Sequence, residues 1–513
     1  MTIPVRAELS ICALPDAEAL HHIGLLIDDA CERRSGSDTD HAFTLLEELQ
    51  ARPLSPDLAS TVHYFRANAW ANRRLACTRT EGWAWEQPER QEEILELRRA
   101  VRHAGFEQLD RIRQCQILTN LAGQLSSIGR FIDALELWDR ALRLEPRFGM
   151  ALGNRGLGLS HYARSLYDSL HMSMMLATAH DVLAAAADGV YENPSYAAAK
   201  ATFQDTRRQI AARLDLEDVR RIDLQNHSLG DSREEQRYRA WCLQQRLFIN
   251  PLNDLGALPI AACDVLTLPS LTVSESGVYP PEIVGFFNQM KQEFVSARQL
   301  YHEGITATEV HYSDREVRLY NTLDYPAHSL AVEKVRLAFR AAYSLFDKIA
   351  FFINHYFAIG LPLRQVSFRS IWFEPRGQRP YPLRPRLTTY ENWPLRGLFW
   401  LSKDLFEEQF QVVTEPDAAA LNDIRNHLEH KYLQVHDPMG MGARANEADH
   451  LGCRVSRPDL EAKTLRILKL ARAALIHLSL AVRREERLRA RQGDRQGLTA
   501  PFPLSVLDDD WKR

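Results

Sequence analysis

The sequence predicts a mainly α-helical protein, with helical hairpins in its N-terminal part and a helical bundle in its C-terminal part. Three observations predict this fold class. Apolar residues recur every three or four positions along most of the chain, they make up 45% of the 513 residues, and only one segment has the residue types of strands. That segment, 308–322 (TEVHYSDREVRLYNT), has two β-prone runs around Ser313 and Asp314, for which we expect a small β-hairpin.

The N-terminal prediction depends on residues 115–148, which have the pattern of two helices that cross closely. Gly129 provides a turn between them, Trp138 has the size to fill the gap, and Pro146 ends the second helix. Small residues allow the close crossing: Ala122, Ala134 and Ala141. The segment therefore predicts one helical hairpin.

This 34-residue unit resembles a tetratricopeptide (TPR) repeat, whose length and small-residue pattern it shares. It departs from the repeat at three positions, all of which keep an apolar or small residue: Leu118, Ala122 and Leu125. A repeat array needs neighbours to bury its faces, and 61–75 and 149–163 are candidates for them. We expect a TPR-like region over residues 1–165, and the alternative is a generic helical hairpin.

A helical connector is expected over residues 166–281, where it ends in an irregular stretch rich in Pro and Ser. From there, residues 282–490 predict the helical bundle. Its strongest element is 331–357, in which apolar residues alternate steps of three and four. They form one core stripe: Val335, Ala338, Ala342, Leu345, Ile349, Phe352 and Tyr356. Residues 491–513 are expected to form a flexible tail.

Further helices of the bundle are expected over about 282–301, 391–410 and 414–435, and from residue 456 onward. The last two begin with the same signal, in which a hydroxyl N-cap is followed by Pro and then Asp in the first turn. The signal stands at two places: Thr414 to Asp417 and Ser456 to Asp459. Residues 437–457 between these helices are expected to form a long loop.

Charge and cysteine content exclude several classes of protein. With 63 Lys and Arg against 67 Asp and Glu, the formal net charge is −4, which argues against a wholesale polyanion binder but leaves room for local basic faces. Seven scattered cysteines without a C-x-x-C spacing are typical of reduced thiols in a cytoplasmic protein. Because the first residues lack a leader pattern and no apolar run is long enough for a membrane span, we expect a cytoplasmic protein with no membrane partner.

The helix predicted over 418–435 carries the candidate catalytic residues. At 100° per residue its apolar residues fall on one face: Leu421, Ile424, Leu428, Tyr432 and Val435. Asn426 and His430 fall on the opposite face, one turn apart, and Arg425 falls on the flank. Histidine serves as general acid or base near neutral pH, and Arg offers phosphate a planar, permanently charged fork. Arg425, Asn426 and His430 are therefore candidates for a phosphodiester site.

Other interpretations of these residues stay open. In the simplest one, Arg425 pairs with Glu429 on an exposed helix face and His430 is a solvated surface histidine. A metal site is another, because His427 and His430 stand three residues apart, but their spacing matches no defined zinc signature. We expect no metal and no cofactor.

The string Arg425–His430, R-N-H-L-E-H, resembles the Arg-polar-x-x-x-His signature of HEPN domains, helical bundles of which many are RNases. Asn426 is the polar residue that the family prefers after the Arg, and Tyr432 matches an extended form of the signature. Further stretches resemble one branch of the family, and they begin at Trp241, Phe346, Ser367 and Leu395. The resemblance covers residues 238–489.

This resemblance implies a metal-independent endoribonuclease whose products carry 2′,3′-cyclic phosphate and 5′-hydroxyl ends. Arg425 would stabilise the scissile phosphate, His430 would transfer the proton, and Asn426 would orient the substrate or His430. The resemblance also implies a homodimer through the HEPN bundle. It further implies that modification of Tyr432 is a means of regulation.

Local basic segments flank the motif and are candidates for RNA contacts. Between residues 364 and 396, seven Arg stand against two Glu, with aromatic residues among them. Arginine with aromatic residues suits backbone contact and base stacking on single-stranded RNA. The candidate RNA-binding residues are Arg384, Arg386, Tyr390, His427 and Lys431. The alternative for such segments is a solvated helix face.

The sequence thus predicts a HEPN endoribonuclease that acts on RNA as an effector of antiviral defence or as a toxin. Its TPR-like region would sense or dock a protein activator or inhibitor. The alternative is a non-enzymatic TPR/HEPN adaptor that binds a protein partner or a nucleotide. A third hypothesis joins the two, with the RNase held inactive by modification of Tyr432.

Overall fold

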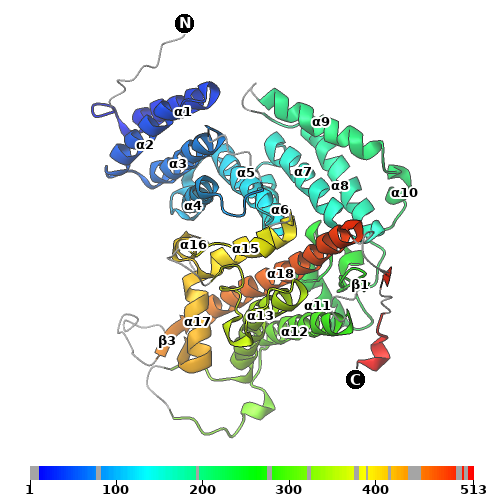
Figure 1. The fold of residues 1–513 in the computed structure, drawn as a ribbon. Helices are drawn as coiled ribbons and strands as arrows, with labels where there is room; N and C mark the ends of the chain where they lie inside the picture. The colour runs from blue at the N-terminus through cyan, green and yellow to red at the C-terminus, as the bar shows by residue number, and fades with distance from the viewer. Residues whose placement is uncertain are drawn as a thin grey trace. The chain divides into compact units, whose positions relative to one another are not determined.

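The structure, a computed structural model, describes residues 11–76, 83–191, 196–273, 280–320, 325–374, 381–388, 391–413, 418–436, 452–492, 500–501 and 506–512. Helices make up most of this part of the chain, so the predicted fold class is confirmed (Figure 1). None of the described helices is both long enough and apolar enough to cross a membrane.

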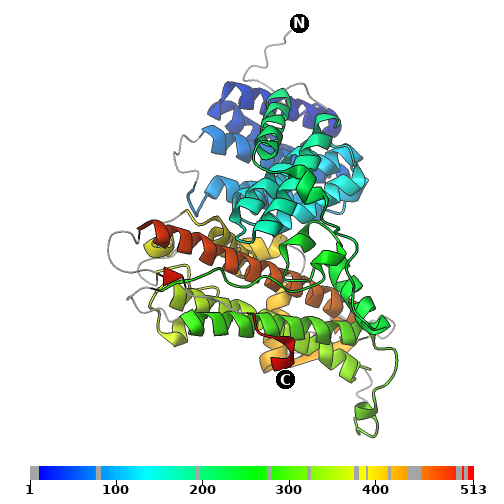
Figure 2. The same cartoon turned by 90° about the vertical axis from the view of Figure 1, so that its right-hand side faces the viewer.

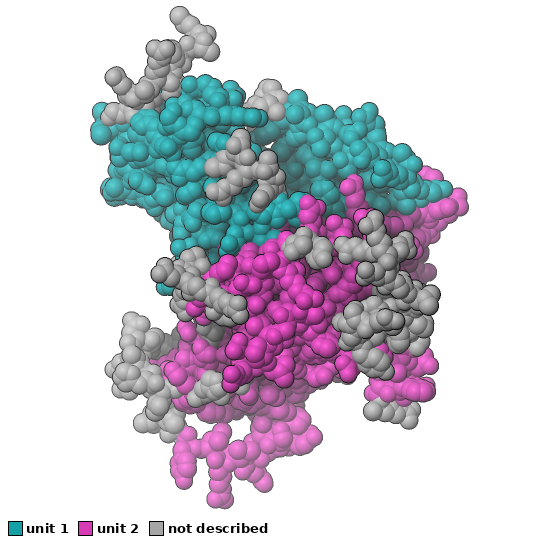
Figure 3. Space-filling model, viewed as in Figure 1, with its two compact units in different colours: residues 1–162, 175–216, 407–416 teal, residues 163–174, 217–406, 417–513 magenta. Residues whose placement is uncertain are grey.

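The chain divides into two compact units (Figure 3). Unit 1 consists of residues 1–162, 175–216 and 407–416, and unit 2 consists of residues 163–174, 217–406 and 417–513. Each unit is therefore assembled from separate stretches of sequence. The domain boundaries expected after residues 165, 281 and 490 stay a prediction.

Unit 1 is built from helical hairpins. Consecutive helices pack against each other as the pairs α1 and α2, α3 and α4, and α5 and α6. The unit contains all or most of these helices: α1 (Asp16–Arg33), α2 (Gly36–Gln50), α3 (Pro56–Ala76), α4 (Pro88–Arg102), α5 (Arg111–Ser127), α6 (Phe131–Leu144), α7 (Gly149–Ser165), α8 (Ser169–Ala187), α9 (Ala197–Ala211) and α16 (Glu408–Val413).

The helical hairpin predicted over residues 115–148 is confirmed as α5 and α6. Gly129 makes the turn with a φ of 95°, in the region that favours glycine. The helices cross so closely that the Cys115 thiol lies 3.3 Å from the carbonyl oxygen of Ala141. Trp138 is 2% exposed and packs against α7, where a side chain at Gly158 would come within 2.5 Å of the ring. The tryptophan thus joins this hairpin to the next helix.

Unit 2 is a bundle of long helices. Helix α12 lies along α13, and α18 contacts α12, α13 and α15; in Figures 1 and 2, α18 (red) runs beside the green helices. The stripe predicted on α13, from Val335 to Tyr356, is buried throughout. The main helices are α11 (Arg233–Gln244), α12 (Pro280–Thr306), α13 (Leu330–Tyr356), α15 (Trp393–Phe406), α17 (Ala418–His430) and α18 (Arg457–Gln492), with the short α10 (Leu216–Arg220) and α14 (Pro385–Thr388).

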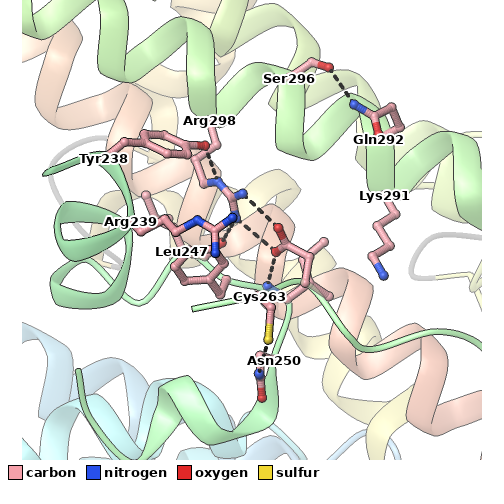
Figure 4. A network of polar contacts seen from close by, with 12 residues as sticks. Tyr238, Arg239, Leu247, Asn250, Cys263, Lys291, Gln292, Ser296 and Arg298 are labelled. Atoms are coloured by element: carbon pink, nitrogen blue, oxygen red, sulfur yellow. Dashed lines mark hydrogen bonds and ion pairs between the residues drawn. The ribbon is translucent and has the colours of Figure 1, made fainter. Parts of the chain in front are cut away.

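Two buried arginines fix the segment 247–264 to the long helices. Arg298 of α12 donates to both carboxylate oxygens of Asp264, at 3.0 and 2.8 Å, and also to the Leu247 carbonyl and the Tyr238 hydroxyl (Figure 4). Arg472 of α18 donates to Asp254 at 2.6 Å and to two backbone carbonyls of the same segment. Since both guanidinium groups are about 2% exposed, their charges depend on these partners.

The described strands form two small sheets. Strand β2 (Tyr432–His436) pairs in parallel with β3 (Gly452–Ser456), and β1 (Thr272–Val273) pairs antiparallel with β4 (Ala500–Pro501). The helix predicted as far as residue 435 is therefore wrong beyond His430, where β2 follows. The loop predicted over 437–457 is wrong for residues 452–456, which form β3. Pairing explains the change, because β3 runs beside the whole of β2. The strand is buried on both faces after Tyr432, with Leu433 and Val435 at 4% and 0% exposed and Gln434 and His436 at 6% and 3%.

The β-hairpin predicted over 308–322 is wrong for the residues that the structure describes. Residues 308–320 contain a 3₁₀ turn (Tyr312–Asp314) and no strand, and 321 and 322 lie outside the described residues. Glu316 has a φ of 65°, which interrupts any extended run. The Asp314 carboxylate instead accepts a hydrogen bond from the backbone N–H of Leu330, at the start of α13. The β-prone side chains thus have no strand partner in this part of the chain.

The helix starts and ends follow the predicted signals only in part. At α18, the Ser456 hydroxyl accepts a hydrogen bond from the backbone N–H of Asp459 at 3.2 Å, which confirms the predicted cap. The corresponding signal from Thr414 to Asp417 lies outside the described residues. The helix expected over 391–410 is interrupted at Glu407, so that α15 ends at Phe406 and α16 begins at Glu408.

Candidate functional site

Helix α17 carries the predicted motif and is held by its apolar face. It packs against α13 and α15 and against the two strands β2 and β3. Leu421 and Ile424 are each 2% exposed, as expected for residues on the core side of the helix. Because α17 is continuous from Ala418 to His430, Asn426 and His430 lie one turn apart on the same helix.

Arg425 lies against helix α13. Its guanidinium carbon is 5.7 Å from the centre of the Tyr343 ring, which is the geometry of a cation–π contact. Its Nη1 also donates to the side-chain oxygen of Asn426 at 3.4 Å. Both residues are half-buried. The structure therefore brings Arg425 and Asn426 together, with one face of the guanidinium covered by an aromatic ring.

Tyr343 is the residue of this site that the sequence analysis missed. It is 5% exposed, and its ring lies between those of Phe339 and Phe346, with centroids 6.1 and 6.0 Å away. Burial raises the pKa of its hydroxyl to about 12, although the charge of Arg425 opposes this shift and Asp347 adds to it. The hydroxyl is therefore neutral at physiological pH. The signal that could have identified Tyr343 is the helical spacing of aromatic residues at 339, 343 and 346. Each of them directly follows a residue of the predicted stripe.

The motif ends where α17 ends, at His430. The side chains of Glu429 and His430 lie outside the part of the chain that is described. The Nδ1 atom of His427 forms a hydrogen bond with the backbone carbonyl of Asp423 at 2.7 Å, so this ring nitrogen already has a partner within α17. Lys431 is exposed and follows the helix end.

Tyr432 begins strand β2 and is 40% exposed, so it does not continue the apolar face of α17. The same strand brings polar groups next to the motif. The Gln434 side-chain oxygen accepts a hydrogen bond from Arg454 Nε at 2.9 Å. His436 is 3% exposed, and neither of its ring nitrogens has a hydrogen-bond partner among the described residues. The sequence analysis missed these residues because it expected a helix there.

The Arg-rich segment 381–388 carries two of the predicted RNA-binding residues, and both arginines belong to the described part of the chain. Arg384 is half-buried and donates through Nε to the Ile371 carbonyl at 3.1 Å, and burial lowers its pKa. Arg386 is exposed on the short helix α14, and Tyr390 lies outside the described residues. Of the two arginines, Arg386 is thus the one whose side chain is open to solvent.

No three side chains of His, Cys, Asp or Glu come together among those that the structure describes. The metal alternative for His427 and His430 stays open, because the His430 side chain lies outside them. Part of the chain matches a known protein family. Residues 274–485 match the family model described as LA2681-like HEPN, a range that includes α13, α15, α17 and most of α18. No curated protein and no solved structure matches the chain.

Proposed function

We propose that this chain, which carries a HEPN domain over residues 274–485, is a metal-independent endoribonuclease. The observation that carries the proposal is the pairing of Arg425 with Asn426 on α17, one turn before His430, within that domain. A permanently charged phosphate ligand, an orienting amide and an acid–base residue then lie on one helix. These are the groups that RNA transesterification needs.

In the proposed reaction the nucleophile is the 2′-hydroxyl of the RNA itself. It attacks the adjacent phosphorus, a new P–O bond closes the 2′,3′-cyclic phosphate, and the bond to the 5′-oxygen breaks. His430 takes part in moving the proton from the 2′-oxygen or to the departing 5′-oxygen, which leaves as a hydroxyl. Arg425 stabilises the charge on the non-bridging oxygens, and Asn426 orients the substrate or His430.

The contact with Tyr343 supports this role for Arg425. An aromatic ring on one face of a guanidinium leaves its N–H edges available, and those edges are the groups that bind phosphate. Since the hydroxyl of Tyr343 is neutral below a pKa of about 12, it places no negative charge beside the guanidinium. Arg425 is thus held in place without being neutralised.

The wider role is part of the proposal. The RNase would act in antiviral defence or as a toxin in the cytoplasm, as a homodimer, and the helical hairpins of unit 1 would dock a protein activator or inhibitor. Arg386, His427 and Lys431 would contact RNA, together with Arg384 and Tyr390. Modification of Tyr432, whose side chain is 40% exposed, would regulate the enzyme.

Cleavage of labelled RNA in the presence of EDTA tests the proposal. We expect wild-type protein to leave cyclic-phosphate ends, and we expect Arg425→Ala and His430→Ala each to lose at least about 100-fold in rate, the usual contribution of such groups. Arg208→Ala, which changes a side chain that is 78% exposed on α9, is the control and should retain the wild-type rate. Unchanged cleavage by His430→Ala would refute the site.

A non-enzymatic adaptor is the second candidate function. The observation that favours it is that the Arg425 guanidinium already has partners in Tyr343 and Asn426, as a purely structural arginine would. RNA that binds wild-type protein but stays intact over a broad pH range would support this alternative. Intact-mass analysis of the protein purified with its genomic neighbours would detect an adduct on Tyr432, which the inhibited-RNase hypothesis requires.

A further inference from the structure

Residues 307–320, here called the arm, expose more large apolar side chains than any described stretch of similar length. They follow α12 in the connection to α13 and project from the bundle at the lower edge of Figures 1 and 2. The exposed fractions of these side chains are 67% for Val310, 76% for Tyr312, 57% for Val317, 60% for Leu319 and 98% for Tyr320. Apolar side chains gathered on one projecting segment mark an interaction surface.

The backbone of the arm is open as well. Its middle is fixed to the start of α13, where the Asp314 carboxylate accepts a hydrogen bond from Leu330 N–H at 2.8 Å. Beyond the turn, residues 317–320 belong to no helix or strand, and no backbone hydrogen bond joins them to another described segment. A β-prone run with free N–H and C=O groups is a template for pairing with another chain. Glu316, with its φ of 65°, holds a conformation that glutamate rarely adopts and that pairing would replace by an extended one.

The charges of the arm indicate what pairs with it. Glu309, Asp314 and Glu316 stand against Arg315 and Arg318, so the arm is slightly acidic and poorly suited to RNA. Opposite charges flank Val317 directly, with Glu316 before it and Arg318 after it. If two arms run antiparallel with Val317 opposite Val317, Glu316 of each copy faces Arg318 of the other. This sequence is complementary to itself.

We propose that the arm is a self-association element, in which residues 315–319 of two copies of this chain pair as antiparallel strands about Val317. One face of the pair then brings the two Val317 side chains together, with Leu319 of each copy against the aliphatic stem of the other copy's Arg315, and the opposite face carries two Glu316–Arg318 ion pairs. This interface is separate from one made by the faces of the helical bundle, and it does not depend on the proposed cleavage activity.

Disulfide trapping tests the register. In a background with the exposed Cys12, Cys31 and Cys263 replaced by Ser, Val317→Cys should form a covalent dimer under mild oxidation, because the two side chains face each other. Tyr320→Cys is the matched control. Its position is 98% exposed, against 57% for Val317, yet the two copies would lie about 20 Å apart in the proposed register. Equal trapping at both positions would overturn the proposal.

Charge exchange tests the partner. Glu316→Arg and Arg318→Glu should each weaken the dimer about tenfold, because each change sets like charges opposite each other twice. The double variant restores both pairs and should restore the wild-type dissociation constant, measured by analytical ultracentrifugation. A wild-type protein that stays monomeric would overturn the proposal, and so would a dimer unaffected by the single changes. Since no RNA is present, neither result depends on catalysis.

Discussion

Replacing Tyr343 by Leu removes the aromatic ring against which Arg425 lies, and this change tests how the site is held together. The ring centre is 5.7 Å from the guanidinium carbon, close to the outer limit of about 6 Å for a cation–π contact. In a half-buried site such a contact contributes about 1 kcal/mol, which corresponds to a factor of about five in an equilibrium or rate constant. We therefore expect kcat/KM for RNA cleavage to fall about fivefold to tenfold in Tyr343→Leu.

Tyr343→Phe is the matched control, because it keeps the ring and removes only the hydroxyl. We expect its kcat/KM to stay within about twofold of wild type. Leu also loses packing against Phe339 and Phe346, so thermal unfolding of each variant must show that the assays are run on folded protein. In an Arg425→Ala background, Tyr343→Leu should have no additional effect on residual cleavage.

Two results would refute this reasoning. If Tyr343→Phe loses as much activity as Tyr343→Leu, the hydroxyl and not the ring supports the site. If Tyr343→Leu retains full activity while Arg425→Ala does not, the ring does not position the guanidinium. The second outcome would leave Arg425 a role that does not depend on α13.

The remaining predictions concern stability. Arg472→Ala leaves the Asp254 carboxylate buried without its cation and should cost about 3–5 kcal/mol in urea unfolding, whereas the exposed Arg208→Ala should cost almost nothing. Ser456→Ala removes the N-cap of α18 and should cost about 1 kcal/mol, and Ser456→Thr should retain most of it. The folded pKa of Tyr343, about 12, lies above its ordinary 10, so its stabilising contribution is complete below pH 10 and is lost as the pH rises toward 12. Over this range the free energy of unfolding should fall less steeply with pH in Tyr343→Phe than in wild type. Equal slopes would contradict the raised pKa.

The parts of the fold that the sequence predicted are those determined by local periodicity. The stripe on α13 was visible because one helix repeats its buried positions every three or four residues. The hairpin of α5 and α6 was visible because glycine, proline and small residues mark its turn, its end and its crossing. Both signals lie within a few turns of chain.

The errors arose where the deciding partner is distant in the sequence. The spacing of Leu421, Ile424, Leu428 and Tyr432 fits a helix, and only β3, paired through Tyr432 and Gly452, selects a strand after His430. The arm has strand-forming residues but no strand partner among the described residues, so its composition alone led to the wrong prediction of a β-hairpin. The site itself was predicted only in its helical part, because Tyr343 lies on another helix and carries no motif of its own.

The position of helix α16 limits where the protein can be cut into fragments. It lies in sequence between α15 and α17 of unit 2, yet it belongs to unit 1, where Phe410 is 0% exposed and its ring lies 5.6 Å from the Arg98 guanidinium of α4. A fragment that begins at residue 217 would carry this helix without α4, so Phe410 would lose the surface that covers it. The helical hairpins therefore cannot be exchanged for another module at a single crossover, and we expect recombinant fragments cut at one point to aggregate.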